Sequence, residues 1–288
     1  MTQTPPSVAD KRRLFHQMHE AGCFIIPNPW DVGSARFLQG LGFKALATTS
    51  SGFAWSQGRP DGGVSVNQAL GHLHTLVAST DVPINADFES GFAADTAGVA
   101  RNVRLAVESG VAGLSIEDST GDPMRPLYDL STAVERIRAA RKSIDETGGD
   151  TLLVGRAECF LVGRSDLVET IARLKAYANA GANCLYAPGL RTRDQIAALV
   201  AGVAPHPVNV LIGWPSDLTM PDLAALGVRR VSVGGALARC AWGAFARAAK
   251  LLAQQGVFTG FADAYSGAEL NSFFSNDLKH RTIGPDAQ

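Results

Sequence analysis

Charged side chains close three apolar runs of the sequence that have the length of buried strands. Asp87 and Glu89 end the run in P-I-N-A-D-F-E-S-G, Glu117 ends the run in G-L-S-I-E-D, and Arg156 follows L-L-V-G. Residues i and i+2 of a strand point to the same face, so we expect Asp87 and Glu89 to converge. Such a pair is typical of a metal site or of acid/base catalysis. Each residue alone also fits a strand that becomes polar where it leaves the core, but their coincidence favours a site.

The chemistry of this group favours a hard metal ion. Its members are mainly oxygen ligands, and carboxylate oxygens select Mg²⁺ or Mn²⁺. None of the histidines, at positions 16, 19, 72, 74, 206 and 280, is expected at the carboxyl end of a strand. Zinc and non-haem iron normally need histidine or cysteine, so both are disfavoured. Because Mg²⁺ keeps several waters, we expect one direct carboxylate ligand and positions left for a chelating α-oxo acid.

Composition excludes several classes of partner. The 288 residues include 26 Lys plus Arg and 27 Asp plus Glu, and the basic residues are scattered, so nucleic acid is not expected. Neither a signal peptide nor an apolar stretch of about 18 residues is present, which predicts a cytoplasmic protein without a membrane segment. The four cysteines lie far apart in apolar runs and are expected to be free, buried thiols.

Apolar runs of strand length alternate with stretches of helical periodicity along most of the chain. About eight such units predict an α/β fold, a (β/α)8 TIM-type barrel over residues 7–256, after a disordered lead at 1–6. An open doubly wound sheet is the main alternative, but its usual G-x-G-x-x-G is missing. Four turns, L-G-F-K-A, S-G-V-A-G, A-G-A-N-C and L-G-V-R-R, place glycine just past a helix. Strands are expected at 23–27, 45–50, 82–89, 114–118, 151–158, 184–188, 208–212 and 230–233, and a Gly-rich loop at 52–63.

In such a barrel the active site lies at the carboxyl ends of the strands and in the loops after them. The six lysines fall in helices or where a strand begins, so a Schiff base with a carbonyl substrate is not expected. Gly234 and Gly235 could bind a phosphate at a helix N-terminus, although a tight turn is the simpler interpretation. The residues expected at the site are Thr49, Ser50, Ser51, Asp61, Asp87, Glu89, Glu117, Arg156 and Glu158.

Taken together, these motifs resemble the isocitrate lyase and phosphoenolpyruvate mutase superfamily. The likeness covers about residues 20–255 and depends on G-F-K-A-L-A-T-T-S-S-G-F, D-F-E-S-G-F, S-I-E-D and V-G-R-A-E-C-F. D-F-E-S-G-F stands where the family often has D-x-D-x-G-Y-G. The resemblance implies that Asp87 binds Mg²⁺ directly. Glu89, Glu117 and Asp61 would hold the metal's waters.

The resemblance also implies how a substrate is bound. Backbone amides near Ser50 and Ser51, beside Thr49, would bind the substrate carboxylate. Arg156 would face the oxygen on which negative charge develops, and Asn209 in P-V-N-V would hydrogen-bond the distal part of the ligand. The implied catalytic residues are Arg156, Glu117 and Asp61.

One loop departs from the family pattern. After the strand that carries the glutamate, the lyases have K-[KR]-C-G-H, whose cysteine donates a proton, whereas this chain has S-T-G-D-P-M-R-P-L-Y-D. The K-T-N-S-type segment of phosphoenolpyruvate mutases and phosphonopyruvate hydrolases is also missing, so we expect a less characterised branch. Tyr128, Tyr186 and Cys159 could stand in as proton donor, although ordinary packing is the simpler interpretation of each.

These observations predict a Mg²⁺-dependent lyase that breaks a carbon–carbon bond in a small α-oxo or α-hydroxy carboxylic acid through a metal-stabilised enolate. The alternatives are C–P chemistry of the mutase or hydrolase type and a relative that binds metal and oxo acid without catalysis. Residues 257–288 carry apolar side chains at mostly helical spacing beyond the barrel. Because family members exchange a terminal helix between subunits, we expect this extension to be swapped in a homodimer or homotetramer.

Overall fold

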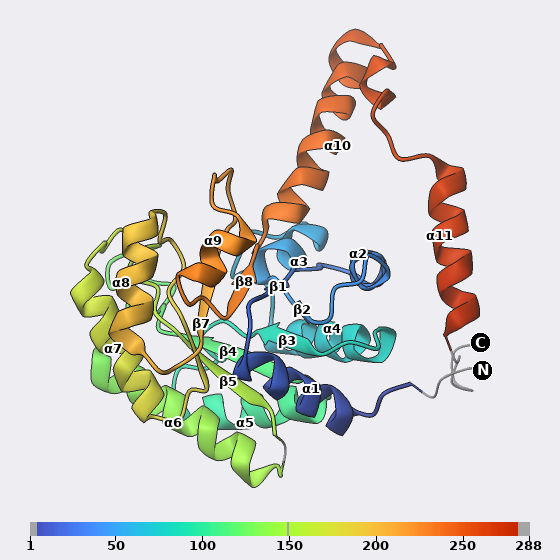
Figure 1. The fold of residues 1–288 in the computed structure, drawn as a ribbon. Coiled ribbons are helices and arrows are strands. Elements are labelled where there is room, and N and C mark those ends of the chain that lie inside the picture. The colour runs from blue at the N-terminus through green and yellow to red at the C-terminus, as the bar shows by residue number, and fades with distance from the viewer. Residues whose placement is uncertain (1–4, 149, 282–288) are drawn as a thin grey trace.

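The computed structural model describes residues 5–148 and 150–281, and its centre is one sheet of eight parallel strands (Figure 1). The strand order β1-β8-β7-β6-β5-β4-β3-β2 runs around a nearly closed barrel, which confirms the predicted (β/α)8 fold. The strands are β1 (Phe24–Ile26), β2 (Leu46–Ala47), β3 (Ile84–Asp87), β4 (Gly113–Glu117), β5 (Leu152–Arg156), β6 (Cys184–Tyr186), β7 (Val208–Leu211) and β8 (Arg230–Ser232).

Helices alternate with the strands and cover the outside of the sheet (Figure 1). All four glycines expected just past a helix adopt the left-handed backbone, with φ between 83° and 104°, because the chain must reverse there into the next strand. They are Gly42, Gly110, Gly181 and Gly227. The helices of the barrel are α1 (Val8–Glu20), α2 (Val32–Gly40), α3 (Ser50–Ser56), α4 (Val66–Ser79), α5 (Thr96–Glu108), α6 (Leu130–Glu146), α7 (Leu167–Asn179), α8 (Arg193–Val203) and α9 (Met220–Ala225).

The barrel closes at a seam between its first two strands. The Ala47 amide donates to the Pro27 carbonyl at 3.0 Å just beyond the end of β1. The side chain of Asn28 reinforces this seam, since its amide nitrogen donates to the Thr48 carbonyl and its oxygen accepts from the Val233 amide, both at 2.9 Å. One side chain thus joins the segments that follow β1, β2 and β8.

Helix α1 closes the amino-terminal end of the barrel. Its Phe15 is completely buried and packs with inward-facing residues of the strands, among them Ile26 and Leu152. A Cβ at Gly113 of β4 would lie 2.6 Å from the Phe15 ring, so glycine is required there. The opposite end of the barrel is left for a site.

Two local expectations are wrong. The segment expected as a loop from residue 52 instead begins within α3, whose first turn is capped by the Thr49 hydroxyl, which accepts from the Gly52 amide at 3.3 Å. The strand expected to reach Glu89 ends at Asp87, and Glu89 has a left-handed φ of 46°. Phe88 between them is completely buried, so the chain turns to place this ring in the core, and the two carboxylates do not share a strand face.

Helix α10 (Ala236–Gln255) projects away from the barrel, and the chain then returns through η1 (Thr259–Phe261) and α11 (Gly267–His280) (Figure 1). Cys240 of α10 is exposed, which corrects the expectation that every cysteine is buried; all four are free. Most of the lead expected at 1–6, and the end of the extension expected over 257–288, lie outside the described residues. No helix in the described part of the chain is long and apolar enough to cross a membrane.

The histidine at the end of α1 makes folding sensitive to acid. His19 is 6% exposed between the rings of Phe15 and Phe24, and burial lowers its pKa to about 3. Between that pH and the usual histidine pKa of about 6.5, the unfolded chain binds the additional proton, so acid favours unfolding. His19 should therefore lower the unfolding free energy of the wild type by about 2 kcal/mol between pH 7 and pH 5. His19→Leu should not show this part of the decrease.

Urea unfolding at the two pH values measures this difference. His74→Leu is the matched control, because His74 is an exposed histidine of α4. An unchanged pH dependence in His19→Leu would show that His19 is not the responsible group.

Candidate active site

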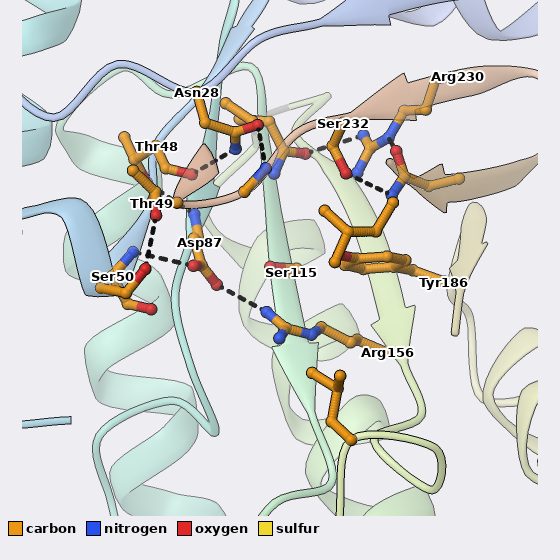
Figure 2. Close-up of a pocket in the computed structure, with 18 of the residues that line it drawn as sticks. Asn28, Thr48, Thr49, Ser50, Asp87, Ser115, Arg156, Tyr186, Arg230 and Ser232 are labelled. Atoms are coloured by element: carbon orange, nitrogen blue, oxygen red, sulfur yellow. Dashed lines mark hydrogen bonds and ion pairs between the residues drawn. The ribbon is translucent and has the colours of Figure 1, made fainter. Parts of the chain in front are cut away.

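A cavity of about 180 Å³ opens among the residues at and beyond the carboxyl ends of the strands (Figure 2). Polar side chains from most of the strands and from the start of α3 face it, with few apolar neighbours. Its lining includes the predicted Thr49, Ser50, Ser51, Asp61, Asp87, Arg156 and Asn209, and Tyr186, which was suggested as a proton donor. It also includes Asn28, Asn85, Ser115, Arg230 and Ser232, which were not expected there.

Arg156 at the end of β5 holds the carboxylates of neighbouring strands together. Its Nη1 lies 3.1 Å from Asp87 Oδ1 and 3.1 Å from Glu117 Oε2. Its Nε donates to Glu158 Oε1 at 2.5 Å. Burial opposes the charge on Arg156, but Glu158 and Glu117 outweigh it and hold its pKa well above the usual value. The guanidinium is therefore a permanent positive charge, and Figure 2 shows it directed at Asp87.

The site contains more carboxylates than one arginine can neutralise. Burial raises the pKa of Asp61, Glu117 and Glu158, and burial together with Asp87 and Asp61 raises the pKa of Glu89 to about 7. Glu89 Oε1 is buried and has no hydrogen-bond partner among the described residues. An excess of acidic oxygens with one of them unsatisfied fits a hard divalent cation.

The acidic side chains do not form a complete protein cage. Within residues 5–148 and 150–281, no three of the His, Cys, Asp and Glu side chains are arranged to hold a metal ion together. A cation with one direct carboxylate ligand and several waters needs no such cage. The expected arrangement, with Asp87 as the direct ligand and Glu89 and Glu117 farther away, therefore remains a prediction.

The start of α3 places backbone and hydroxyl groups beside Asp87. The Ser50 amide donates to Asp87 Oδ2 at 2.9 Å, and the Asp87 amide donates to the Thr48 hydroxyl at 2.8 Å. The hydroxyls of Thr49 and Ser51 lie 3.1 Å apart. The residues expected to bind a carboxylate thus do lie at the cavity, although the Ser50 amide contacts Asp87.

A buried network behind the site fixes the end of β5. Asp118, which is 2% exposed, accepts from the Glu158 amide at 2.8 Å and from Arg173 and Tyr177 through its other oxygen. Glu158 in turn orients Arg156. The signal for Asp118 in the sequence was its place after Glu117 in S-I-E-D, but its partners on α7 could not be read from that motif.

The three suggested proton donors are separated by the fold. Tyr186 of β6 lines the cavity with its ring 5.1 Å from the Arg156 guanidinium, and burial raises its pKa to about 12, so its hydroxyl stays protonated. Cys159 is completely buried outside the cavity lining, and Tyr128 lines a separate groove with the 119–129 loop. The amides of Val233 and Gly234 both donate to Asn28 Oδ1. The Gly234 amide is therefore not free for the phosphate that Gly234 and Gly235 could have bound.

Comparison with known proteins identifies the class of enzyme to which this barrel belongs. The family profile of phosphoenolpyruvate phosphomutase matches residues 15–253. The chain belongs to the isocitrate lyase and phosphoenolpyruvate mutase superfamily, whose members are Mg²⁺-dependent carbon–carbon lyases and mutases, and it is an enzyme of this lyase group.

Three relatives illustrate the likeness. A crystal structure from Burkholderia cenocepacia J2315, named only provisionally as a lyase/mutase, is 47% identical with a TM-score of 0.90, covering 93% of this chain and 97% of the other. Oxaloacetate acetylhydrolase, solved with the product oxalate, is 26% identical with a TM-score of 0.83, covering 96% and 98%. Oxaloacetate decarboxylase of Paraburkholderia xenovorans is 29% identical, covering 78% of this chain and 75% of its own.

Proposed function

We propose that this enzyme is a Mg²⁺-dependent lyase that cleaves a carbon–carbon bond of a small α-oxo or α-hydroxy carboxylic acid. The observation that carries the proposal is the position of Arg156, which pairs with Asp87, Glu117 and Glu158 at the wall of a polar cavity. The site contains more carboxylates than this arginine can neutralise. Superfamily members are generally dependent on a divalent metal. Asp87 would hold Mg²⁺ with Glu89, Glu117 and Asp61 around its waters. The ion would supply a Lewis acid for the oxygens of the oxo acid.

The chain's own residues have distinct tasks in this proposal. Thr49, Ser50 and Ser51 bind the carboxylate next to the reacting carbon. When the carbon–carbon bond breaks, one fragment leaves as CO₂ or, in a retro-aldol cleavage, as a carbonyl compound whose hydroxyl proton passes to solvent. The electron pair of the bond passes into the enolate of the other fragment, and Arg156 faces the oxygen that gains negative charge, a type of contact that contributes about 3 kcal/mol. Tyr186, whose hydroxyl keeps its proton, is the candidate to protonate the carbon of the enolate.

Turnover assays test the reaction class. The protein is incubated with and without Mg²⁺ against oxaloacetate, methylisocitrate, alkylmalates and phosphonopyruvate. Mg²⁺-dependent cleavage of one of the carbon acids is expected. Turnover of phosphonopyruvate alone would assign C–P chemistry instead, and binding without any turnover would assign a non-catalytic relative.

We also propose that the protein is a homodimer or homotetramer through α10. Helix α11 packs on α2 of its own chain, where Asp277 pairs with Arg36 and Phe273 lies 4.8 Å from Phe37 between ring centroids. Helix α10 is different, because only Ala238 of its residues is buried. Its exposed apolar side chains and those that follow it are Leu237, Trp242, Phe245, Leu252, Phe258, Phe261 and Tyr265.

Phe245→Glu should therefore give a monomer at micromolar concentration, because a charge would replace a ring that is 62% exposed in the single chain. Light scattering measures the mass of both proteins. Leu105→Glu is the control, since Leu105 is 42% exposed on α5, a helix that lies away from α10 (Figure 1). A wild-type monomer, or an oligomer unaffected by Phe245→Glu, would contradict the proposal.

A further inference from the structure

Two buried polar atoms beside the candidate metal site have no hydrogen-bond partner among the described residues. They are Nε2 of His72 on α4 and Oε1 of Glu89 just beyond β3. Both residues line one small cavity of about 20 Å³. A buried polar atom without a partner is costly, because it loses its hydrogen bonds to water and gains none in return. Two such atoms at one cavity therefore indicate a shared partner that is small enough to fit inside it.

The cavity suits one water molecule. About 10–15 Å³ of such space is enough for a water that can contact two or more polar groups. His72 and Glu89 supply these groups, and much of the remaining wall is apolar. The cavity adjoins the larger one, with which it shares four residues that lie together in Figure 2, namely Thr48, Thr49, Ser50 and Asp87.

The imidazole of His72 is held by its neighbours. It stacks on the Phe53 ring of α3, with 3.9 Å between the ring centroids and 11° between the ring planes. Burial lowers the pKa of His72 to about 4, so the ring is neutral near pH 7 and one of its nitrogens carries a hydrogen. With that hydrogen on Nε2, the ring can donate to an oxygen in the cavity.

The carboxylate of Glu89 is not supported in the way that its neighbours are. Arg156 pairs directly with Asp87 and Glu117, whereas Glu89 forms no ion pair within the described part of the chain. Its main chain is fixed, because the Glu117 amide donates to the Glu89 carbonyl at 3.0 Å. The orientation of its carboxylate therefore depends on the cavity, where the unpartnered Nε2 of His72 is available.

We infer that a single water in this cavity accepts from His72 Nε2 and donates to Glu89 Oε1, so that His72 is a positioning residue for Glu89. The bond would hold the carboxylate beside Asp87, where Glu89 would bind the waters of Mg²⁺ in the proposed function on which this inference rests. A carboxylate has about four lone-pair sites, so acceptor capacity is left for those waters. His72 does not line the larger cavity and acts only through Glu89.

Calorimetric titration with Mg²⁺ in the absence of substrate tests this role. His72→Leu should weaken binding about tenfold, the lower end of the effect typical of groups that support a metal ligand. His72→Gln, whose amide can donate to the same water, should restore most of the affinity. His74→Leu, which removes an exposed histidine of the same helix, should leave the affinity unchanged. Wild-type affinity in His72→Leu, or equal losses in the Leu and Gln variants, would overturn the inference.

Coupling to Glu89 separates positioning from a general structural effect. In Glu89→Ala the carboxylate that His72 positions is gone, so adding His72→Leu should cause no further loss of Mg²⁺ affinity. The same loss in the double variant as in the single His72→Leu variant would assign His72 to the structure alone and overturn the inference.

The metal-free protein gives a readout that does not depend on the proposed function. Nitrogen-15 NMR of labelled histidine should show His72 protonated at Nε2, with a resonance that moves in Glu89→Ala but not in Glu108→Ala, which removes an exposed glutamate of α5. This result without any Mg²⁺ binding by the wild type would refute only the proposed metal chemistry. A hydrogen on Nδ1, or a resonance that does not move in Glu89→Ala, would refute the role of His72 even if the enzyme is an active lyase.

Discussion

Arg156→Lys is expected to lower kcat about a hundredfold or more while the fold is retained. The guanidinium pairs through Nη1 with Asp87 and Glu117 and through Nε with Glu158. These three carboxylates lie at the ends of β3 and β4 and just after β5. A lysine ammonium is a single point charge and cannot keep these directions while also facing a substrate oxygen. Steady-state rates measured at saturating substrate and Mg²⁺ give the comparison.

Arg164→Lys is the matched control for this substitution. Arg164 also pairs with a glutamate, Glu169, but its side chain is 51% exposed, so the substitution should leave kcat unchanged. If Arg156→Lys retained a rate within a few-fold of the wild type, Arg156 would have no role in the chemical step.

Asp87→Ala should abolish Mg²⁺ binding, because it removes the only direct protein ligand of an ion that gives up its waters reluctantly. Glu89→Ala should weaken binding less, since Glu89 lies beyond the strand and would act through water. Calorimetric titration with Mg²⁺ in the absence of substrate measures both effects without relying on activity.

Asp122→Ala controls for the loss of one negative charge near the barrel mouth, because Asp122 lies in the 119–129 loop outside the cavity lining. Circular dichroism checks that Asp87→Ala keeps its fold, as the variant loses the contacts to Ser50 and Arg156. Equal Mg²⁺ affinity in Asp87→Ala and the wild type would remove Asp87 from the metal site.

Periodicity and turn chemistry were sufficient to predict the barrel, because strand length, helical spacing and glycine past the helices are local signals. The same locality explains the errors. S-S-G-F-A-W-S looks like loop sequence, and only the Thr49 cap and the contact of α3 with the barrel make it a helix. The turn at Glu89 follows from burial of Phe88, which depends on the packed core.

The site was predictable where motifs lie at strand ends and was missed where partners come from distant segments. Asp87, Glu117 and Arg156 were found from their positions and do meet in space. Arg230 looked like an ordinary residue at the start of V-R-R-V-S-V, and its partner Asn85 is 145 positions away. An arginine that interrupts an apolar strand was the only available signal.

The contact of Asn28 with Val233 joins groups 205 positions apart. Such a bond cannot form until nearly the whole barrel has been synthesised, and long-range pairing of this kind slows folding. The cavity is lined by Thr48, which follows β2, and by Ser232 at the end of β8. A nascent chain in which β8 has not yet been synthesised therefore lacks part of the pocket lining. The enzyme can bind its substrate only after β8 has joined the sheet and the barrel has closed.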